Sequence, residues 1–404
     1  MQLRRSRSKR NIFLVFGAIL CIVVALIAIV IFNRPLPRAI SNNKPPAQTS
    51  RPAPTTIRLI ASGDMIAHDS INQQAKTPNG YDYSPYFSEV KPVFEKADIR
   101  FCNQEIPSAS PALGSPSGYP TFNAPTEFAR DINTLGCNVI NTATNHANDK
   151  LQAGIDETLR VWQELPKLAL AGINRSSEEQ QKVHYFTVKG IKFAFLAYNY
   201  QNNNKNTAPF SVNMFDESLM RKQLQEAAQQ GAYSIVSMHW GTEDSPVIDQ
   251  AQEKWSQFLA DNGADIVIGT GPHVIQPVKK LARQGGGETL VWYSIGNLLS
   301  TQLKIEELIG GFAVMDFEVN KSDIKLKDIG FLPTYMHYEW SASQAAAQDL
   351  LARRNIKLYL LEDASAPLGR SLFNTSVQSQ TERISSLLNS YTPVQIIKKQ
   401  AYGL

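Results

Sequence analysis

The chain has 404 residues, of which 43% are hydrophobic and 19% are charged, a composition typical of a folded protein rather than a disordered one. The formal net charge is +4, but residues 1–54 hold nine of the 40 Lys and Arg residues and none of the 36 acidic residues. The rest of the chain therefore has a net charge of about −5, which excludes the basic excess of a typical nucleic-acid-binding surface.

The first predicted element is an apolar run of 21 residues at positions 12–32, long enough for a helix to cross a bilayer. The basic segment 1–11 before it places the amino terminus in the cytoplasm and the main domain outside, as a single-pass protein of the cell membrane. A cleaved signal peptide is the alternative, and Ala25–Ala28 keeps it open. Its apolar core would be shorter and followed by a small-residue cleavage site, whereas Asn33-Arg34-Pro35 follows here.

Residues 33–56 contain six prolines among Ser, Asn, Gln and Thr, which predicts an extended linker. From residue 57, strand-like runs alternate with amphipathic stretches, so we expect an α/β domain at 57–333. A carboxyl-terminal extension, 334–404, is expected to pack on it.

The predicted strands are Ile57–Ser62, Ile99–Asn103, Asn138–Asn141, Lys192–Tyr198, Ser234–His239, Ile266–Gly269, Leu290–Ser294, Phe312–Phe317 and, in the extension, Ile356–Leu361. The predicted helices are Tyr86–Lys96, Thr126–Leu135, Gly154–Leu165, Glu217–Gln230, Asp249–Asn262, Ala342–Arg353 and a final helix within Ser371–Leu388.

Three cysteines are present, and Cys21 lies in the apolar run. Cys102 and Cys137 lie in or beside predicted strands, so we interpret them as buried free thiols. A single disulfide is the alternative, and it requires a compartment outside the cytoplasm.

Polar side chains follow five of the predicted strands. They are Asp64, Glu105, Asn145 with His146, His239, and His273. Each one alone is equally well explained by a turn, a helix cap or a hydrogen-bonded buried histidine. As a set at the carboxyl ends of strands, however, they predict a shared site. Oxygen and nitrogen ligands without sulfur suit one or two divalent ions of Mn, Fe, Zn or Mg.

Asp149 follows His146 by three residues. A carboxylate beside an imidazole fixes its tautomer and raises its pKa, as a general acid or a phosphate-orienting group requires. We therefore predict that His146 and Asp149 form a catalytic pair.

Four segments resemble the CapA family of capsule and poly-γ-glutamate synthesis proteins, and the resemblance runs from about Ile57 to Pro333. These segments are Asn145–Asp149, His239–Glu243, Pro272–Pro277 and Ser294–Asn297. The resemblance implies a calcineurin-like metallophosphoesterase fold, with two stacked mixed sheets flanked by helices in a four-layer αββα sandwich.

The resemblance also implies roles for individual residues. Asp64, Glu105 and His273 would hold a first metal, and Glu105 would bridge to a second metal held by Asn145 and His239. His146 would protonate or orient the leaving oxygen, with Asp149 orienting His146. The remaining candidates, expected to support the ligands or to contact substrate, are His68, Asn103, Glu243 and Asn297.

Two positions depart from the pattern of the broader superfamily. Ile66 stands where a histidine usually follows the first aspartate, and His68 could replace it only if the turn bulges. Gly271 stands where many relatives have a further histidine. We therefore expect one metal, or a weak second site.

These observations predict a metal-dependent phosphoesterase or hydrolase in capsule or poly-γ-glutamate biosynthesis or export. Its expected partners are an anionic envelope polymer or phosphorylated substrate, the membrane and other capsule-synthesis membrane proteins, but no nucleic acid. The alternative is a non-catalytic envelope factor that retains the fold and binds a polymer.

Overall fold

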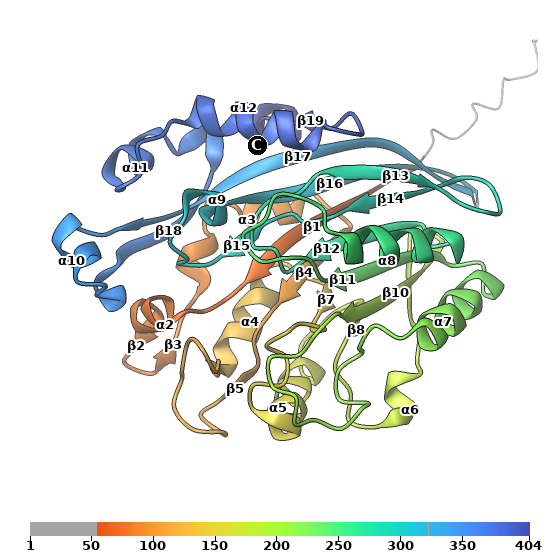
Figure 1. Cartoon of the computed structure of the whole chain (residues 1–404), viewed down its shortest axis with the longest axis horizontal. Coiled ribbons are helices and arrows are strands. Elements are labelled where there is room, and N and C mark those ends of the chain that lie inside the picture. The colour runs from red at the N-terminus through yellow and green to blue at the C-terminus, as the bar shows by residue number, and fades with distance from the viewer. Residues whose placement is uncertain (1–54, 322) are drawn as a thin grey trace, which may run out of the picture. The chain divides into compact units, whose positions relative to one another are not determined.

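The structure, a computed structural model, describes residues 55–321 and 323–404. Two mixed β-sheets form the centre of this part of the chain (Figure 1). The larger sheet has the order β18-β17-β16-β1-β4-β7-β8, with β15 paired to β1 and β19 to β17, and the smaller has the order β13-β14-β12-β11-β10-β9. The strands of the larger sheet are β1 (Thr55–Met65), β4 (Ile99–Gln104), β7 (Val139–Asn141), β8 (Ala169–Ala171), β15 (Asn297–Leu299), β16 (Ile309–Asn320), β17 (Asp323–Glu339), β18 (Arg354–Leu360) and β19 (Gln395–Ile396).

The smaller sheet contains β9 (His184–Val188), β10 (Ile191–Asn199), β11 (Tyr233–His239), β12 (Ile266–Thr270), β13 (Val278–Ala282) and β14 (Glu288–Trp292). Short pairs are formed by β2 (Lys76–Thr77) with β3 (Gly80–Tyr81) and by β5 (Ser108–Ser110) with β6 (Ala124–Pro125). Every predicted strand is present, with bounds that shift at the ends. The strands β1, β4, β7 and β8 pair in parallel, as do β10, β11, β12 and β14, so each sheet brings several carboxyl ends to one edge.

Apolar side chains between the sheets hold them together. The ring of Phe101 on β4 lies 6.0 Å from that of Phe195 on β10, and Tyr233 on β11 lies 5.5 Å from Phe317 on β16. Alternate residues on the smaller sheet face the other way, where Val236 and Val267 share an apolar cluster with Leu224 of α7 (Glu217–Gln229) and Leu259 of α8 (Gln250–Asp261). This is the period-two pattern of strands buried on both faces.

Helices complete the layers. Phe94 of α3 (Lys91–Glu95) packs on Phe312 of β16, opposite the face that meets the smaller sheet. Trp162 of α5 (Leu151–Gln163) donates a hydrogen bond to Gln104 at the end of β4. Helices α7 and α8 cover the smaller sheet (Figure 1). The order helix, sheet, sheet, helix agrees with the expected α/β sandwich.

The helices are α2 (Asp69–Ala75), α3 (Lys91–Glu95), α4 (Thr126–Leu135), α5 (Leu151–Gln163), α6 (Ser177–Gln180), α7 (Glu217–Gln229), α8 (Gln250–Asp261), α9 (Ile305–Leu308), α10 (Ala342–Ala346), α11 (Ser365–Arg370), α12 (Val377–Leu388) and α13 (Lys399–Tyr402). Short 3-10 helices are η1 (Ser84–Phe87), η2 (Leu350–Ala352) and η3 (Leu361–Asp363).

Two predicted helices are wrong in extent. The expected helix Tyr86–Lys96 is divided into η1 and α3, because Pro92 cannot donate the backbone hydrogen bond of a helix interior and instead occupies the first turn of α3. The expected helix Ala342–Arg353 ends at Ala346 and is followed by η2.

The interpretation of Cys102 and Cys137 as free thiols is wrong, because the two cysteines form a disulfide. Cys102 lies in β4, and Cys137 lies just before β7, the strand that pairs with β4. Both are buried. The register of two adjacent parallel strands brings together residues 35 positions apart, a proximity that the sequence does not reveal.

The predicted anchor at 12–32 lies outside the described residues. Within the described part of the chain, no helix has the length and apolar character needed to cross a membrane. Residue 334, the expected start of the extension, falls inside β17, and β18 and β19 join the same sheet beyond it.

Candidate metal centre

Asp64 lies near the end of β1 and is fully buried. Its Oδ1 accepts a hydrogen bond from Asn103 Nδ2 at 2.7 Å, and its Oδ2 accepts one from the backbone N–H of Gly271 at 3.2 Å. Gly63 precedes it inside the strand, where a Cβ atom would lie 1.7 Å from the carbonyl oxygen of Gly296. Glycine is therefore required by the close approach of Gly296, the residue just before β15.

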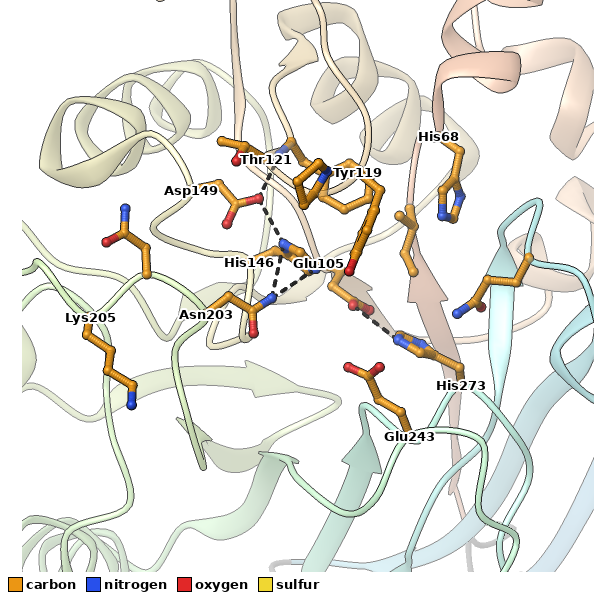
Figure 2. A pocket seen from close by; sticks show the side chains of 15 residues that line it. His68, Glu105, Tyr119, Thr121, His146, Asp149, Asn203, Lys205, Glu243 and His273 are labelled. Carbon is orange, nitrogen blue, oxygen red and sulfur yellow. Dashed lines mark hydrogen bonds and ion pairs between the residues drawn. The ribbon is translucent and has the colours of Figure 1, made fainter. Parts of the chain in front are cut away.

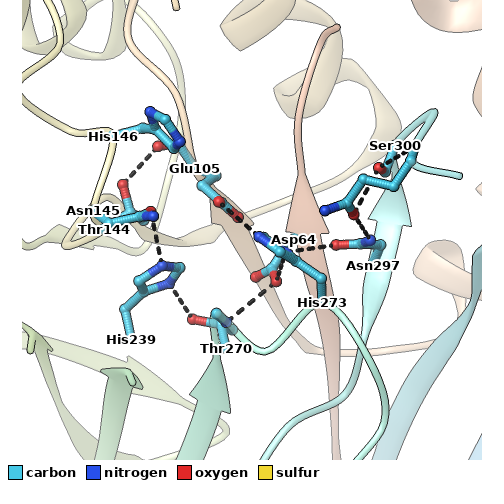
Figure 3. Close-up of polar contacts among 12 residues, drawn as sticks. Asp64, Glu105, Thr144, Asn145, His146, His239, Thr270, His273, Asn297 and Ser300 are labelled. Carbon is cyan, nitrogen blue, oxygen red and sulfur yellow. Dashed lines mark hydrogen bonds and ion pairs between the residues drawn. The ribbon is translucent and has the colours of Figure 1, made fainter. Parts of the chain in front are cut away.

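His273 lies close to three of the candidate residues, Asp64, Asn297 and Glu105 (Figure 3). Its Nδ1 lies 3.0 Å from Asp64 Oδ2 and 3.1 Å from Asn297 Oδ1, and its Nε2 lies 3.7 Å from Glu105 Oε1. Burial alone would lower the pKa of His273, but the charge of Glu105 and the hydrogen bond to Asp64 raise it to about 10. Burial is the largest influence on Asp64 and would raise its pKa, but the hydrogen bond to His273, the charges of His273 and His239 and the Gly271 N–H together hold the pKa of that carboxyl below its ordinary value. His273 has a φ of +60°, an uncommon conformation for a histidine that points to a local constraint.

Glu105 follows β4 and is only 1% exposed, yet neither of its carboxylate oxygens has a hydrogen-bond partner. Its backbone carbonyl accepts a hydrogen bond from Thr144 Oγ1 at 2.6 Å, which fixes its position. Burial and the negative charge of Asp64 raise its pKa well above the ordinary value. A buried carboxylate without donors is costly unless a positive charge compensates it.

His239, at the end of β11, lies on the other side of the same cluster. Ligand atoms of Asp64, Glu105 and His239 all lie within 4.8 Å of one another. The Nε2 atom of His239 is 3.0 Å from Asn145 Oδ1, and its Nδ1 is 3.0 Å from Thr270 Oγ1. Burial lowers the pKa of His239 to about 4, so its ring is neutral and able to coordinate near neutral pH. These carboxylate, amide and imidazole groups, around a Glu105 carboxylate that has no hydrogen-bond donor, fit a divalent cation.

His146 and Asp149 form the predicted pair in the turn after β7. His146 Nδ1 lies 2.8 Å from Asp149 Oδ2, and this oxygen also accepts a 2.7 Å hydrogen bond from the backbone N–H of Phe122. The ring of Phe122 packs edge-on to that of His146 at 4.6 Å. The amide of Asn203 approaches His146 Nε2 at 3.1 Å (Figure 2).

His68 does not replace the ligand missing at Ile66. It packs edge-on to Phe122 at 5.6 Å, and its Nδ1 faces the backbone N–H of Thr301 at 3.4 Å. Burial lowers the pKa of His68 to about 3. Both Ile66 and His68 line the cavity in front of the cluster, but among the described residues His68 is not part of the group with Asp64.

Gly271 leaves no room for a further histidine in the present backbone. Its φ is +108°, and a Cβ atom there would lie 2.9 Å from the carbonyl oxygen of Trp240 and 3.2 Å from His239 Nε2. The position instead contributes its N–H to Asp64. The structure thus has no side-chain ligand at either Ile66 or Gly271.

A cavity of about 760 Å³ opens onto the cluster (Figure 2). Glu105, His273 and Glu243 line one part of it, and His146 and Asn203 line another. Its remaining lining residues are Ile66, His68, Tyr119, Pro120, Thr121, Phe122, Asp149, Asn204, Lys205 and Gln302. The predicted residues Asn103 and Asn297 lie behind the cluster, in contact with Asp64 and His273 respectively.

Sequence reasoning missed the residues that come from loops. Tyr119 and Phe122 belong to a loop between β5 and β6, and Asn203 and Lys205 follow β10. A signal was present for the second loop, because the polar run Gln201–Asn206 follows a buried strand in the same way as the predicted clusters. Thr144 and Thr270 were also missed, although each fixes a candidate ligand.

Comparison with known proteins identifies the group to which the chain belongs. Residues 58–302 match the family described as "Bacterial capsule synthesis protein PGA_cap". The chain is 26% identical over 223 residues to "PGA biosynthesis protein CapA" of Bacillus subtilis (strain 168), a match covering 54% of this chain and 57% of that protein. It is 26% identical over 238 residues to "Capsule biosynthesis protein CapA" of Bacillus anthracis, covering 55% and 56%.

The matches thus span little more than half the length of these relatives. Among solved structures, the calcineurin-like phosphoesterase YfkN from Bacillus subtilis is similar with a TM-score of 0.39 and 12% identity, over 69% of this chain and 90% of that one. The family match covers more than half of the chain and the segments that supply the cluster, and the chain therefore belongs to the bacterial capsule synthesis family PGA_cap, the CapA proteins.

Proposed function

We propose that the protein is a metal-dependent phosphoesterase that acts in the biosynthesis or export of capsule or poly-γ-glutamate. The observation that carries this proposal is Glu105, whose two carboxylate oxygens are buried without a hydrogen-bond partner beside Asp64 and His239. A purely structural cluster would pair such a carboxylate with donors. A divalent cation bound there would stabilise negative charge on a phosphoryl group and activate a water molecule.

The residues on the other side of the cavity suit proton transfer. Asp149 accepts hydrogen bonds from Phe122 and from His146, so the proton on Nδ1 of His146 is held and Nε2 faces Asn203. From this position His146 can donate a proton at Nε2 to a leaving oxygen after it has been protonated, or accept one. Lys205 is the one Lys or Arg among the residues that line the cavity, and it supplies a positive charge for an anionic substrate.

The family and its named relatives support a role in the envelope. An anionic polymer or a phosphorylated precursor is the proposed substrate class, and other membrane proteins of capsule synthesis are the proposed partners. We further propose that residues 12–32 anchor the protein in the cell membrane with the amino terminus in the cytoplasm. The Cys102–Cys137 disulfide supports an oxidising location for the main domain.

The test uses the full chain, purified in mild detergent, with p-nitrophenyl phosphate and bis(p-nitrophenyl) phosphate as probes. We expect hydrolysis of at least one probe that depends on Mn²⁺ and is lost in Asp64→Asn. If the protein binds Mn²⁺ but hydrolyses neither probe, the phosphoesterase proposal is contradicted.

A non-catalytic role in polymer binding is the second candidate, and the absence of side-chain ligands at Ile66 and Gly271 favours it. In that role, an anionic polymer would bind the cavity and remain intact. Binding of oligomeric γ-glutamate without loss of chain length, measured by calorimetry and mass spectrometry on one sample, would support this candidate over the first.

A further inference from the structure

The loop after β11 is fastened to the turn that carries His273. The backbone N–H of Trp240 donates to the carbonyl of Thr270 at 3.0 Å, and that of Asp244 donates to the carbonyl of Pro272 at 2.9 Å. Further along, the carbonyl of Ser245 accepts a hydrogen bond from Gln276 at 2.9 Å. These contacts hold the segment 241–245 against the metal centre.

Two acidic residues in this loop have different environments. Asp244 forms an ion pair with Lys304 at 2.6 Å. Glu243 lines the cavity together with Glu105 and His273, although it lies outside the group formed by Asp64, Glu105 and His239. In the part of the chain that the structure describes, no hydrogen bond or ion pair reaches its carboxylate. Figure 2 shows this carboxylate directed toward Glu105 and His273 rather than away from the cavity.

Two positions beside the cluster offer no side-chain ligand. Ile66 lines the cavity with an apolar side chain, and Gly271 has none. Glu105, in turn, is buried and has two unpartnered oxygens. His273 offsets only part of the negative charge of Asp64 and Glu105, so Glu105 and Glu243, two carboxylates that face one cavity, still repel each other, and a cation between them would remove this repulsion.

We propose that Glu243 is a direct ligand of the divalent cation and closes the site on its solvent side, in place of the ligands absent at Ile66 and Gly271. The inference rests on the proposed cation site. A third carboxylate beside Asp64 and Glu105 makes the ligand set rich in oxygen, which favours Mn²⁺ or Mg²⁺ over Zn²⁺.

The test is Mn²⁺ binding to the full chain in detergent, measured by calorimetry and by electron paramagnetic resonance. Glu243→Gln should weaken the affinity at least about tenfold, and should change the spectrum of the bound ion. Glu253→Gln is the matched control, because Glu253 is an exposed carboxylate on α8 whose partner is Lys279, and it should leave the affinity within about twofold. Glu243→Asp, which keeps the carboxylate, should bind better than Glu243→Gln.

Repeating the titrations at 0.5 M NaCl separates ligation from a general field effect, because salt screens distant charges but not a bound ligand. If Glu243→Gln binds Mn²⁺ within about twofold of the wild-type affinity at high salt, the assignment is overturned. So would unchanged Mn²⁺ affinity in Glu243→Gln while Glu105→Gln abolishes binding, an outcome that leaves the proposed function intact. If the wild-type chain binds no Mn²⁺, the proposed function fails and the assignment fails with it. Unfolding curves recorded with EDTA confirm that each variant is folded.

Discussion

Nδ1 of His273 lies 3.0 Å from Oδ2 of Asp64, although the two residues are 209 positions apart in the chain. Asp64 comes from the nine-stranded sheet and His273 from the turn after a strand of the six-stranded sheet. The stacking of the two sheets therefore assembles the candidate centre, and His273 in its protonated form neutralises part of the charge of Asp64 and Glu105.

Substitution of Glu105 by Gln should separate stability from cation binding. Because the wild-type carboxylate is buried without donors, we expect Glu105→Gln to be at least as stable as the wild type in EDTA. Addition of Mn²⁺ at 100 times its dissociation constant should stabilise the wild type by about 2.7 kcal/mol and the variant not at all. Urea unfolding with and without Mn²⁺ measures both effects, and an equal gain in the two proteins would contradict the assignment of Glu105.

His146 and Asp149 should matter for turnover rather than for cation binding. We expect His146→Asn to lower the rate of phosphoester hydrolysis about 10²- to 10⁴-fold, the usual contribution of a general acid or base. Asp149→Asn should have a smaller effect, because its amide can still accept the hydrogen bond from Phe122. Steady-state kinetics with a chromogenic phosphoester, together with Mn²⁺ titration, checks this prediction, which a loss of Mn²⁺ affinity in either variant would refute.

The Cys102–Cys137 disulfide should contribute to folding stability. Replacing both cysteines by alanine should lower the free energy of unfolding by about 2–4 kcal/mol, the usual range for a bridge across a loop of this size. Reduction of the wild type should produce a similar loss, and the double variant should not respond to reductant. A reductant-insensitive wild type with the same midpoint as the variant would show that the bridge is absent.

We expect Asp131 on α4 to make the free energy of unfolding depend on pH. Burial is the main cause that raises its pKa, from 3.8 to about 6 in the folded protein. The folded state therefore binds more protons than the unfolded state between about pH 4 and pH 6, and the contribution of Asp131 to stability falls as the pH rises through this window. Asp131→Asn, which can still accept the hydrogen bond from the Tyr83 N–H, should flatten the urea midpoint over this range. A midpoint that falls with pH to the same extent in both proteins would count against it.

Gly63 should tolerate no side chain. A Cβ atom at this position would lie 1.7 Å from the carbonyl oxygen of Gly296, so Gly63→Ala should lower the free energy of unfolding by at least about 3 kcal/mol, at or beyond the upper end of ordinary overpacking. Gly369→Ala is the control, because a Cβ atom there meets no atom within 4 Å. Thermal unfolding should separate the two variants clearly, and equal stability would argue against the close contact between Gly63 of β1 and Gly296.

The sequence predicts the strands well, because continuous apolar runs of four to six residues are a strong pattern of buried parallel strands. It also predicts which side chains meet at their ends, since parallel strands place their carboxyl ends along one edge. Asp64, Glu105 and His239 come together in this way. The prediction of one helix at Tyr86–Lys96 was wrong because it followed the spacing of apolar residues, whereas Pro92 confines the α-helix to α3.

Sequence could not predict the parts of the site that depend on three-dimensional register. The pairing of β4 with β7 decides that Cys102 meets Cys137, and the docking of the loop after β10 decides that Asn203 meets His146. His68 illustrates the same limit. Its spacing from Asp64 left a role as ligand open, whereas the structure packs it against Phe122.

The most direct test of the metal centre is a crystal structure of the protein grown with Mn²⁺ and phosphate, with anomalous diffraction recorded at the manganese edge. The account predicts an anomalous peak in contact with Glu105 and Asp64, with a histidine nitrogen from His239 or His273 among its ligands. Crystals that diffract well and contain Mn²⁺ in the solution but show no peak at Glu105 would contradict the account.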